Sequence, residues 1–422
     1  MKTTIKNISG WGNYPVVKAT VIRPDSVEEL LQIVKETPSL LARGNGRSYG
    51  DSSLHHTVVD ITGLNKILNE TDNTIEVQCG ITIEELLVHI VPQKKFLAVT
   101  PGIKSITIGG AIASDVHGKN HLHEGSFFNI TQSLQLINDG GNLVNCSRNQ
   151  NQELFLKVFG SMGLHGIIVS ATIKLMDIET TWFGENQFVA DSFEEIFQLM
   201  EKHRLAPFMV SWLDLLNKQT RGVVKTGNWM DINALPKDKV PVTLNVGQTK
   251  SIPFTFLFAP PAWVFKWYNK KYFATAKQKT SSSLHFNDFF YPLDKIKNWN
   301  RIFGPKGLLQ YHFVLPLVSS KTGMEHVISR VKKSNAICTL AVMKRFGKGN
   351  AETPHSFPIE GYHMALDFIN NKKAIAMIGE LDIYIKSLGG KVYKTKDAVS
   401  SLPKPIVSSS KFDSLQNKRY AS

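Results

Sequence analysis

Cysteine is scarce in this sequence of 422 residues, which has only Cys79, Cys146 and Cys338. The three lie far apart and form neither a Cys-x-x-Cys pair nor the ligand spacing of a zinc site. This scarcity excludes a small disulfide-stapled scaffold and fits structural thiols in a reducing compartment. We therefore expect a cytoplasmic protein, and we expect no metal site.

Long apolar runs are also lacking. No stretch of about 18 consecutive apolar residues occurs, so no membrane-spanning helix is expected. The first ten residues lack the apolar segment of a secretory signal. With 42% apolar and 20% charged residues, the composition is that of an ordinary globular protein long enough for two or three domains.

Acidic residues are fewer than basic ones. Asp and Glu number 35 against 49 Lys and Arg, which gives a formal charge of +14. Such a field favours anionic partners, namely phosphates, acidic lipid headgroups or nucleic acid, but does not choose among them. A host whose proteins are generally rich in lysine would give the same balance.

Residues 1–177 alternate strand patterns with capped helices. The motifs Ser26-x-x-Glu29 and Thr82-x-x-Glu85 are capping boxes, each followed by apolar residues at helical spacing. β-Branched and alternating runs predict strands at 16–23, 40–42, 58–61 and 75–79, a hairpin over 133–145, a helix over 153–159 and a long strand ending at 174. This interleaving predicts a mixed α+β domain.

The pattern changes after residue 177. A helix is expected over 191–203 and a strand over 208–213, whereas residues 215–283 are polar, basic and hard to interpret. Within them, residues 261–273 mix aromatic residues with lysines. That mixture suits a membrane interface or a lipid-phosphate site, but equally a packed helix whose lysines face solvent.

Two glycine-rich segments, residues 43–51 and 107–121, follow strand-like sequence about 60 residues apart. Neither has the GxGxxG spacing after a first strand, which disfavours a Rossmann dinucleotide site. Paired loops with free backbone N–H groups can instead cradle a pyrophosphate between them. His117, Lys119 and His121 would place titratable groups beside the second loop. A simple turn between packed elements remains the alternative.

The motifs in these segments resemble the flavin domain of the vanillyl-alcohol-oxidase superfamily, and within it the decaprenylphosphoryl-ribose oxidase family, the flavin half of a two-enzyme 2′-epimerase. The resemblance rests on Arg43-Gly-Asn-Gly-Arg-Ser-Tyr-Gly-Asp51, Pro101-Gly102, Thr107-Ile-Gly-Gly110 and His117-Gly-Lys-Asn120, and it continues at 163–174, 291–294, 299–301, 304–311, 344–347, 356–358, 366–367 and 389–397. It fails over about 215–283 and after 398.

The resemblance implies an α+β fold with a two-subdomain PCMH-type FAD-binding domain (1–177), an antiparallel-sheet cap with helices (178–390) and a C-terminal segment returning to the FAD domain (391–422). It also implies a set of FAD-binding residues: Ala42, Arg43, Gly44, Asn45, Gly46, Arg47, Ser48, Tyr49, Gly50, Asp51, Ser52, Gly102, Thr107, Ile108, Gly109, Gly110, Ser114, Asp115, Val116, His117, Ile167, Tyr393 and Lys396. Arg47 stands where many superfamily members have a histidine that tethers the flavin, so we expect non-covalent FAD.

The activity implied is oxidation of a secondary alcohol, with hydride passing from carbon to flavin and a base accepting the hydroxyl proton. Lys396, His117 and Lys119 are the catalytic candidates that the resemblance gives. Lys396 needs burial or cationic neighbours to lower its pKa if it is to act as a base. The substrate-binding candidates are Trp212, Tyr291, Gln310, His312, Lys344, Phe346, His363 and Ala365.

Three of these positions depart from the family pattern. Ala365 replaces a cysteine, His363 an asparagine and His312 a glutamine, which puts the pentose substrate and sensitivity to cysteine-directed inhibitors in doubt. The leading hypothesis is oxidation of the 2′-hydroxyl of a polyprenyl-phosphoryl pentose, with a separate short-chain reductase as partner and peripheral contact with the inner membrane. The alternatives are an oxidase of a soluble sugar, alditol or aldonolactone, and a basic non-enzymatic scaffold. We expect no nucleic-acid partner.

Overall fold

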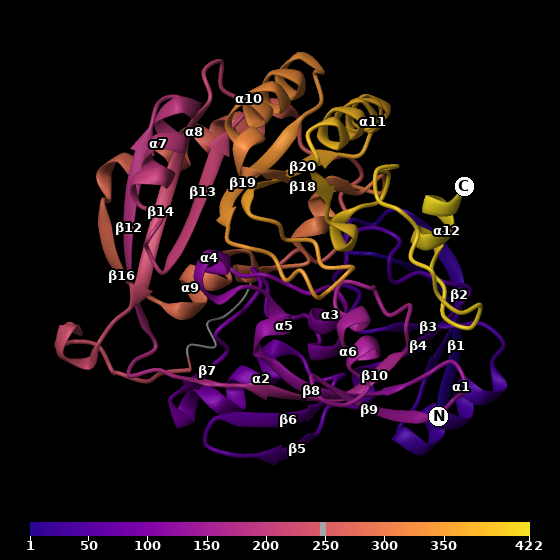
Figure 1. Ribbon diagram of the computed structural model, residues 1–422. Helices are drawn as coiled ribbons and strands as arrows, with labels where there is room; N and C mark the ends of the chain where they lie inside the picture. Colours follow the sequence, from indigo (N-terminus) through magenta and orange to yellow (C-terminus); the bar gives the residue numbers. More distant parts are fainter. Residues whose placement is uncertain (245–249) are drawn as a thin grey trace.

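A computed structural model describes residues 1–244 and 250–422, and it places two N-terminal sheets beneath one large sheet (Figure 1). The smaller N-terminal sheet has the order β1-β2-β4-β3, and the second has the order β5-β6-β10-β8-β9. Their strands are β1 (Lys2–Ser9), β2 (Val16–Arg23), β3 (Leu41–Arg43), β4 (Thr57–Asp60), β5 (Ile67–Glu70), β6 (Thr74–Gln78), β8 (Thr131–Ile137), β9 (Leu143–Ser147) and β10 (Ile167–Lys174). A short pair joins β7 (Lys95–Phe96) to β11 (Met176–Asp177).

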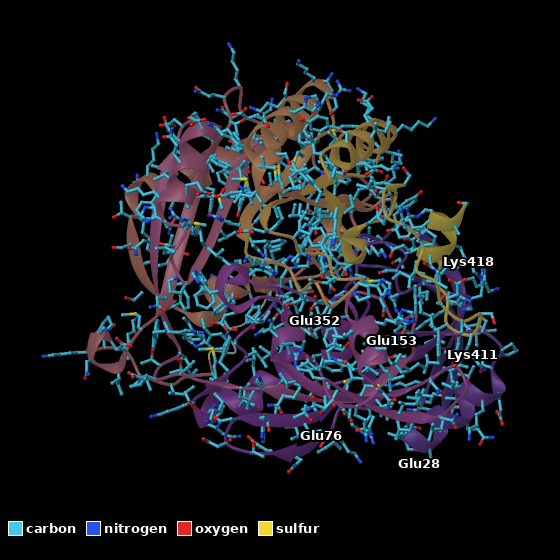
Figure 2. All side chains as sticks on the ribbon, viewed as in Figure 1. Glu28, Glu76, Glu153, Glu352, Lys411 and Lys418 are labelled. Atoms are coloured by element: carbon cyan, nitrogen blue, oxygen red, sulfur yellow. The ribbon has the colours of Figure 1, made fainter. Side chains whose placement is uncertain are left out.

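The first two helices of this region begin where the sequence predicts. Ser26 caps α1 (Val27–Glu36) by accepting a hydrogen bond from the backbone N–H of Glu29. Thr82 and Glu85 form a reciprocal capping box at the start of α2 (Ile83–Ile90). The other helices are α3 (Ile108–Ala113), α4 (His121–Glu124), α5 (Phe127–Ile130) and α6 (Gln152–Val158). The side chains of Glu28 and Glu153, which Figure 2 labels, are exposed on this part of the molecule.

An antiparallel eight-stranded sheet, here called the cap sheet, lies above the N-terminal sheets (Figure 1). Its order is β16 (Ser281–His285), β12 (Trp182–Ala190), β14 (Arg221–Trp229), β13 (Phe208–Asp214), β19 (Cys338–Phe346), β20 (Gly361–Ile369), β18 (Leu308–Pro316) and β21 (Lys391–Val392). The predicted strand 208–213 and helix 191–203 correspond to β13 and to α7 (Phe193–Lys202). The domain boundaries at 177/178 and 390/391 stay predictions.

Helices cover both faces of the cap sheet. On one face α7, α10 (Leu317–Lys333) and α11 (Lys372–Ser387) share an apolar cluster with the inward side chains of the sheet. On the other face α8 (Ala262–Gln278) packs Phe273 and Ala276 against Val223 and Trp212. Below it, α9 (Phe286–Phe290) joins the aromatic core of the N-terminal region.

The region that sequence patterns left unresolved, 215–283, therefore contains β14 and α8. It also contributes β15 (Lys250–Ser251), which pairs with β17 (Ile296–Lys297). Residues 245–249 lie outside the described part. Among the described residues, no helix combines the length and the apolar character that a membrane crossing requires.

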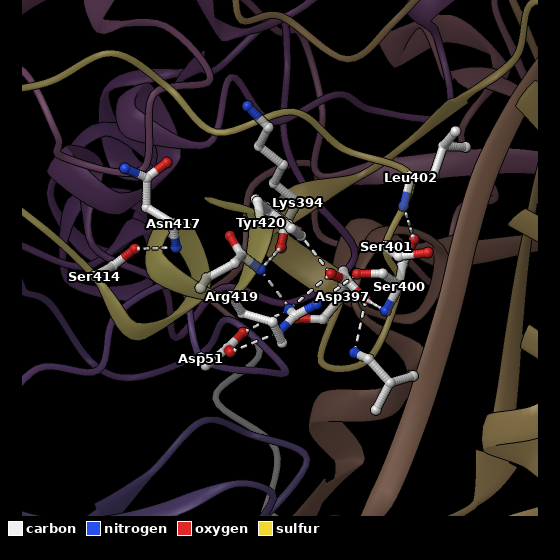
Figure 3. A network of polar contacts seen from close by, with 12 residues as sticks. Asp51, Lys394, Asp397, Ser400, Ser401, Leu402, Ser414, Asn417, Arg419 and Tyr420 are labelled. Atoms are coloured by element: carbon white, nitrogen blue, oxygen red, sulfur yellow. Dashed lines mark hydrogen bonds and ion pairs between the residues drawn. The ribbon is translucent and has the colours of Figure 1, made fainter. Parts of the chain in front are cut away.

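The C-terminal segment runs from the cap sheet back to the small N-terminal sheet and ends in α12 (Leu415–Ala421) (Figure 1). Its Thr395 carbonyl accepts a hydrogen bond of 2.9 Å from the N–H of Tyr49. Arg419 of α12 binds Asp51 with two nitrogens, at 2.9 and 3.0 Å, and also binds Asp397 at 2.9 Å (Figure 3). These contacts tie the C-terminal segment to the first glycine-rich loop.

Candidate active site

A cavity of about 620 Å³ lies between the N-terminal sheets and the cap sheet, a volume typical of ligand pockets. Both glycine-rich segments, the cap sheet, α8 and the C-terminal segment contribute to its wall. The candidates that line it are Ala42, Gly44, Asn45, Gly46, Arg47, Ser48, Tyr49, Ser52, Gly102, Thr107, Gly109, Gly110, Ser114, Val116, His117, Lys119, Trp212, Gln310, His312, Lys344, His363, Ala365, Tyr393 and Lys396.

The two glycine-rich loops face each other across one end of the cavity. A Cβ on Gly44 would overlap the hydroxyl of Thr107 and lie 3.1 Å from its methyl group, so the loops approach in a way that only glycine permits. Asn45 strengthens this contact by donating a hydrogen bond of 2.8 Å from its amide to the carbonyl of Ser105. Gly102, by contrast, has open space where a side chain would stand.

The other candidates lie behind the cavity wall. Arg43 donates to the carbonyl of Ser9 at 2.7 Å, and Asp51 is held by Arg419. Their partners are therefore within the protein. Among the remaining members, Gly50 lies against the carbonyl of Asp397, and Ile108 and Ile167 lie in the apolar core. Asp115 accepts hydrogen bonds from the N–H of Phe128 and the hydroxyl of Ser356. Tyr291 is hydrogen-bonded to Thr100, and Phe346 packs on His117.

Burial changes the proton affinity of the cavity lysines. Desolvation lowers the pKa of Lys396 from 10.5 to about 8, against an opposing effect of the Asp367 carboxylate. Its ammonium lies 4.2 Å from the centre of the Tyr49 ring. Burial, and then repulsion from Lys396, lowers the pKa of Lys344 to about 8. Burial, and then repulsion from Lys344 and Lys225, lowers the pKa of Lys119 to about 7. All three amines are thus poised to exchange protons near neutral pH.

Lys119 is held where the second glycine-rich loop meets α9. Its ammonium donates to the carbonyl of Phe289 and lies 4.4 Å from the centre of the same residue's ring. Lys344 projects from β19 and donates to the carbonyl of Gly118 at 3.4 Å. The cap sheet and the second glycine-rich loop therefore present positive charge to the same space.

Three histidines meet at the inner end of the cavity. Ring nitrogens of His117, His312 and His363 all lie within 4.8 Å of one another, and all three residues are buried. Burial is the largest cause that keeps each imidazole pKa well below 6.5, so the rings are neutral at pH 7. The expectation of no metal site depends on the spacing of residues along the sequence. That spacing cannot show that β18 and β20 bring His312 and His363 next to His117.

Several cavity residues were not singled out from the sequence. Asp367 accepts a hydrogen bond from the amide of Gln310, and burial raises its pKa to about 6. Lys225 lies 3.3 Å from Glu185 and lines the cavity from β14 and β12. Asp367 stands in a motif that carries the resemblance, where it had no role. Tyr268 and Tyr272 come from α8, within the aromatic and lysine-rich segment 261–273, in which neither was assigned a role.

The walls fit a long ligand that passes between closely spaced backbone loops and ends among buried cations. A family model described as an FAD binding domain matches residues 18–147. Gly102 leaves open space where a side chain would stand, and Gly44, Gly46, Gly109 and Gly110 let the backbone line the cavity, which fits that cofactor. The chain is thus an FAD-dependent oxidoreductase with a PCMH-type FAD-binding domain.

Relatives with known names place it more narrowly. The chain is 30% identical to the decaprenylphosphoryl-β-D-ribose oxidase of Mycolicibacterium smegmatis over 94% of its own length and 90% of the relative. It is 26% identical to the D-arabinono-1,4-lactone oxidase of Candida glabrata, but over only 36% of its length and 31% of that protein. The chain belongs to the decaprenylphosphoryl-β-D-ribose oxidase family.

Proposed function

We propose that this enzyme oxidises the 2′-hydroxyl of a polyprenyl-phosphoryl pentose to a ketone, as the first half of a 2′-epimerisation that a separate short-chain reductase completes. The observation that carries the proposal is the meeting of Lys119, Lys344 and Lys396 in one cavity with both glycine-rich loops. Buried positive charge of this kind suits a substrate that carries a phosphate, because the phosphate charge offsets the cost of burying the lysines.

FAD, when bound, supplies the acceptor for the hydride that leaves the substrate carbon. The protein must then remove the hydroxyl proton. Lys396 is the base that we assign, because burial brings its pKa to about 8, where a useful fraction of the amine is neutral. Asp367 faces Lys396 and stabilises the ammonium that forms.

Lys344 and Lys119 are assigned to the substrate phosphate. Lysine binds phosphate as a point charge. Lys119 reaches the cavity from the second glycine-rich loop, and Lys344 reaches it from the cap sheet. A bound phosphate would raise their lowered pKa values and keep both charged. Positioning the phosphate in this way would hold the sugar's reacting carbon in place.

An apolar surface beside the cavity mouth suits the lipid portion of such a substrate. The segment 254–258 and the first turns of α8 expose large side chains next to lysines: Phe254, Phe256, Leu257, Phe258, Trp263, Trp267 and Tyr268, with Lys266, Lys270 and Lys271. Tyr268 belongs both to this apolar surface and to the cavity wall. We propose that this surface contacts an anionic bilayer peripherally, in keeping with the net charge of +14.

A soluble aldonolactone is the second candidate substrate, and the partial similarity to a lactone oxidase favours it. Measuring dye reduction by the FAD-loaded enzyme with each substrate distinguishes the lipid-phosphate hypothesis from the lactone hypothesis. Dye reduction that depends on polyprenyl-phosphoryl ribose or arabinose, and not on free pentoses, alditols or lactones, supports the proposal. Turnover of a lactone or alditol with no response to the lipid phosphate overturns it.

A further inference from the structure

The proposed mechanism gives no step to the three-histidine cluster, which lines the same cavity. His312 lies on β18 and His363 on β20, in neighbouring strands, with ring centres 4.7 Å apart. His117 comes from the second glycine-rich loop, 5.5 and 5.6 Å from them. An aromatic wall of Phe346, Phe357 and Tyr393 encloses the three rings.

The ring nitrogens of this cluster have no partners within the protein. Both nitrogens of His312, both nitrogens of His363 and Nδ1 of His117 are buried, and none of them makes a hydrogen bond to a described residue. A buried polar atom without a partner costs about 1–3 kcal/mol. Five such atoms in one place indicate that a ligand satisfies some of them.

Each neutral imidazole has one donor and one acceptor, so the three rings could in principle bond to one another. No such bond joins them, and their buried nitrogens therefore stay without partners among the described residues. Neutral imidazoles with free lone pairs are instead the donors that borderline divalent metals prefer. We propose that His117, His312 and His363 form a binding site for one such ion, of the class of Zn²⁺, Co²⁺ or Ni²⁺.

The geometry is close to what an ion requires. Nitrogens about 2.0–2.1 Å from zinc in a tetrahedral site stand roughly 3.3 Å from one another. The present nitrogens lie within 4.8 Å, so small rotations of the rings close the site. Three protein ligands leave a fourth position, which is the arrangement of catalytic rather than structural zinc. All three histidines line the cavity, so that position is open to water or to a substrate oxygen.

Positive charge opposes the ion. Lys344 acts electrostatically on all three histidines, and Lys396 acts on His117 and His312. Asp367 is a carboxylate of the cavity wall, but it acts electrostatically on Lys396. We therefore expect a site that fills at micromolar free ion rather than one that retains metal through extensive dialysis. This site does not depend on which alcohol the enzyme oxidises.

The test uses untagged, FAD-loaded protein stripped of metal with a chelator. Zn²⁺ binding is measured by calorimetry, and Co²⁺ is followed by its absorption between 500 and 650 nm, corrected for the flavin spectrum. We expect one ion per chain in wild type. H312Q and H363N should each weaken binding by more than the roughly 10- to 100-fold loss that an outer-shell partner causes.

The matched control is H326Q, because His326 is exposed on α10 and stacks on Tyr384 away from the cavity. It should bind Zn²⁺ like wild type. The flavin spectrum reports the fold of every variant, so that loss of metal with retained FAD is read as loss of ligands. Wild-type protein that binds no stoichiometric ion at 100 µM, or binding that H312Q and H363N leave unchanged, overturns the proposal.

Discussion

Gly44 and Thr107 lie against each other across a gap of more than sixty residues in the chain, with no room for a side chain between them. This contact joins the two glycine-rich loops into one cradle. Residues of both loops line the cavity. We propose that this cradle, rather than either loop alone, holds the dinucleotide.

A methyl group at Gly44 should therefore weaken FAD binding. In G44A the new Cβ would overlap the Thr107 hydroxyl and push the loops apart, and overpacking of this kind costs about 1–3 kcal/mol. FAD affinity should fall about 5- to 150-fold, measured by fluorescence titration of deflavinated protein. G379A is the control, since a Cβ there meets nothing within 4 Å and lies inside α11. Equal affinity in G44A and G379A would contradict the cradle.

The pH profile should show Lys396 as a base. Burial lowers its pKa to about 8. The neutral amine accepts the proton, so kcat should rise with pH through about 8 and level off above it. K396R, which stays charged, should lose this inflection and about 10²- to 10⁴-fold in kcat while keeping FAD. Stopped-flow flavin reduction over pH 6–10 measures both.

Lys394 supplies the control for that profile. Its pKa is also lowered by burial to about 8, but it does not line the cavity. K394R should retain the wild-type inflection. A wild-type rate that falls as pH rises through 8, or an inflection that survives in K396R, would remove Lys396 from the role of base.

The C-terminal helix should be stabilised chiefly by Arg419. This residue pairs with the buried carboxylates of Asp51 and Asp397, and R419M would leave both without their cation (Figure 3). Breaking such a pair costs about 3–5 kcal/mol. Lys418, exposed on the same helix, pairs only loosely with Asp413 at 3.7 Å, so K418M should cost less than about 0.5 kcal/mol. Urea unfolding compares them, and similar midpoints would refute the assignment.

Membrane contact should depend on the tryptophans of α8. Trp263 and Trp267 are 69% and 60% exposed and one turn apart. The double variant W263S/W267S should sediment about tenfold less with vesicles of 30% anionic lipid, while dye reduction with a short-chain substrate stays normal. I383S removes a 75% exposed isoleucine from α11 and should sediment like wild type. Equal sedimentation of the tryptophan variant and wild type would exclude this surface.

Local features of the fold could be predicted from the sequence. The strand 16–23 coincides with β2, and the N-cap at Ser26 and the capping box at Thr82 mark the starts of α1 and α2. The reciprocal half of the predicted box at Ser26 is absent, because the Glu29 carboxylate accepts from the N–H of Asp25. Such signals lie within a few residues of one another, so periodicity and capping chemistry show them directly. The sequence of α8 has no one-sided apolar pattern that would indicate a helix. Its Phe273 and Ala276 pack against the cap sheet, but its equally apolar Trp263 and Trp267 are exposed.

The chemistry of the cavity depends on contacts that only the fold creates. Asp367, the partner of Lys396, was present in a quoted motif, but its burial comes from the position of β20 in the cap sheet. Asp51 stands in the glycine-rich loop, and that it binds FAD stays a prediction. Its pairing with Arg419, 368 residues away, could not be predicted. Long-range pairs of this kind leave no periodic trace in the sequence.

The most direct test of the central claim is a visible spectrum of the purified protein before and after acid precipitation. The cradle formed by Gly44 and Thr107, with Arg47 in place of a tethering histidine, is expected to hold FAD without a covalent bond. The protein should be yellow, and the colour should pass into the supernatant when the chain precipitates. Colour retained in the pellet, or a protein that takes up no FAD at all, would contradict this account.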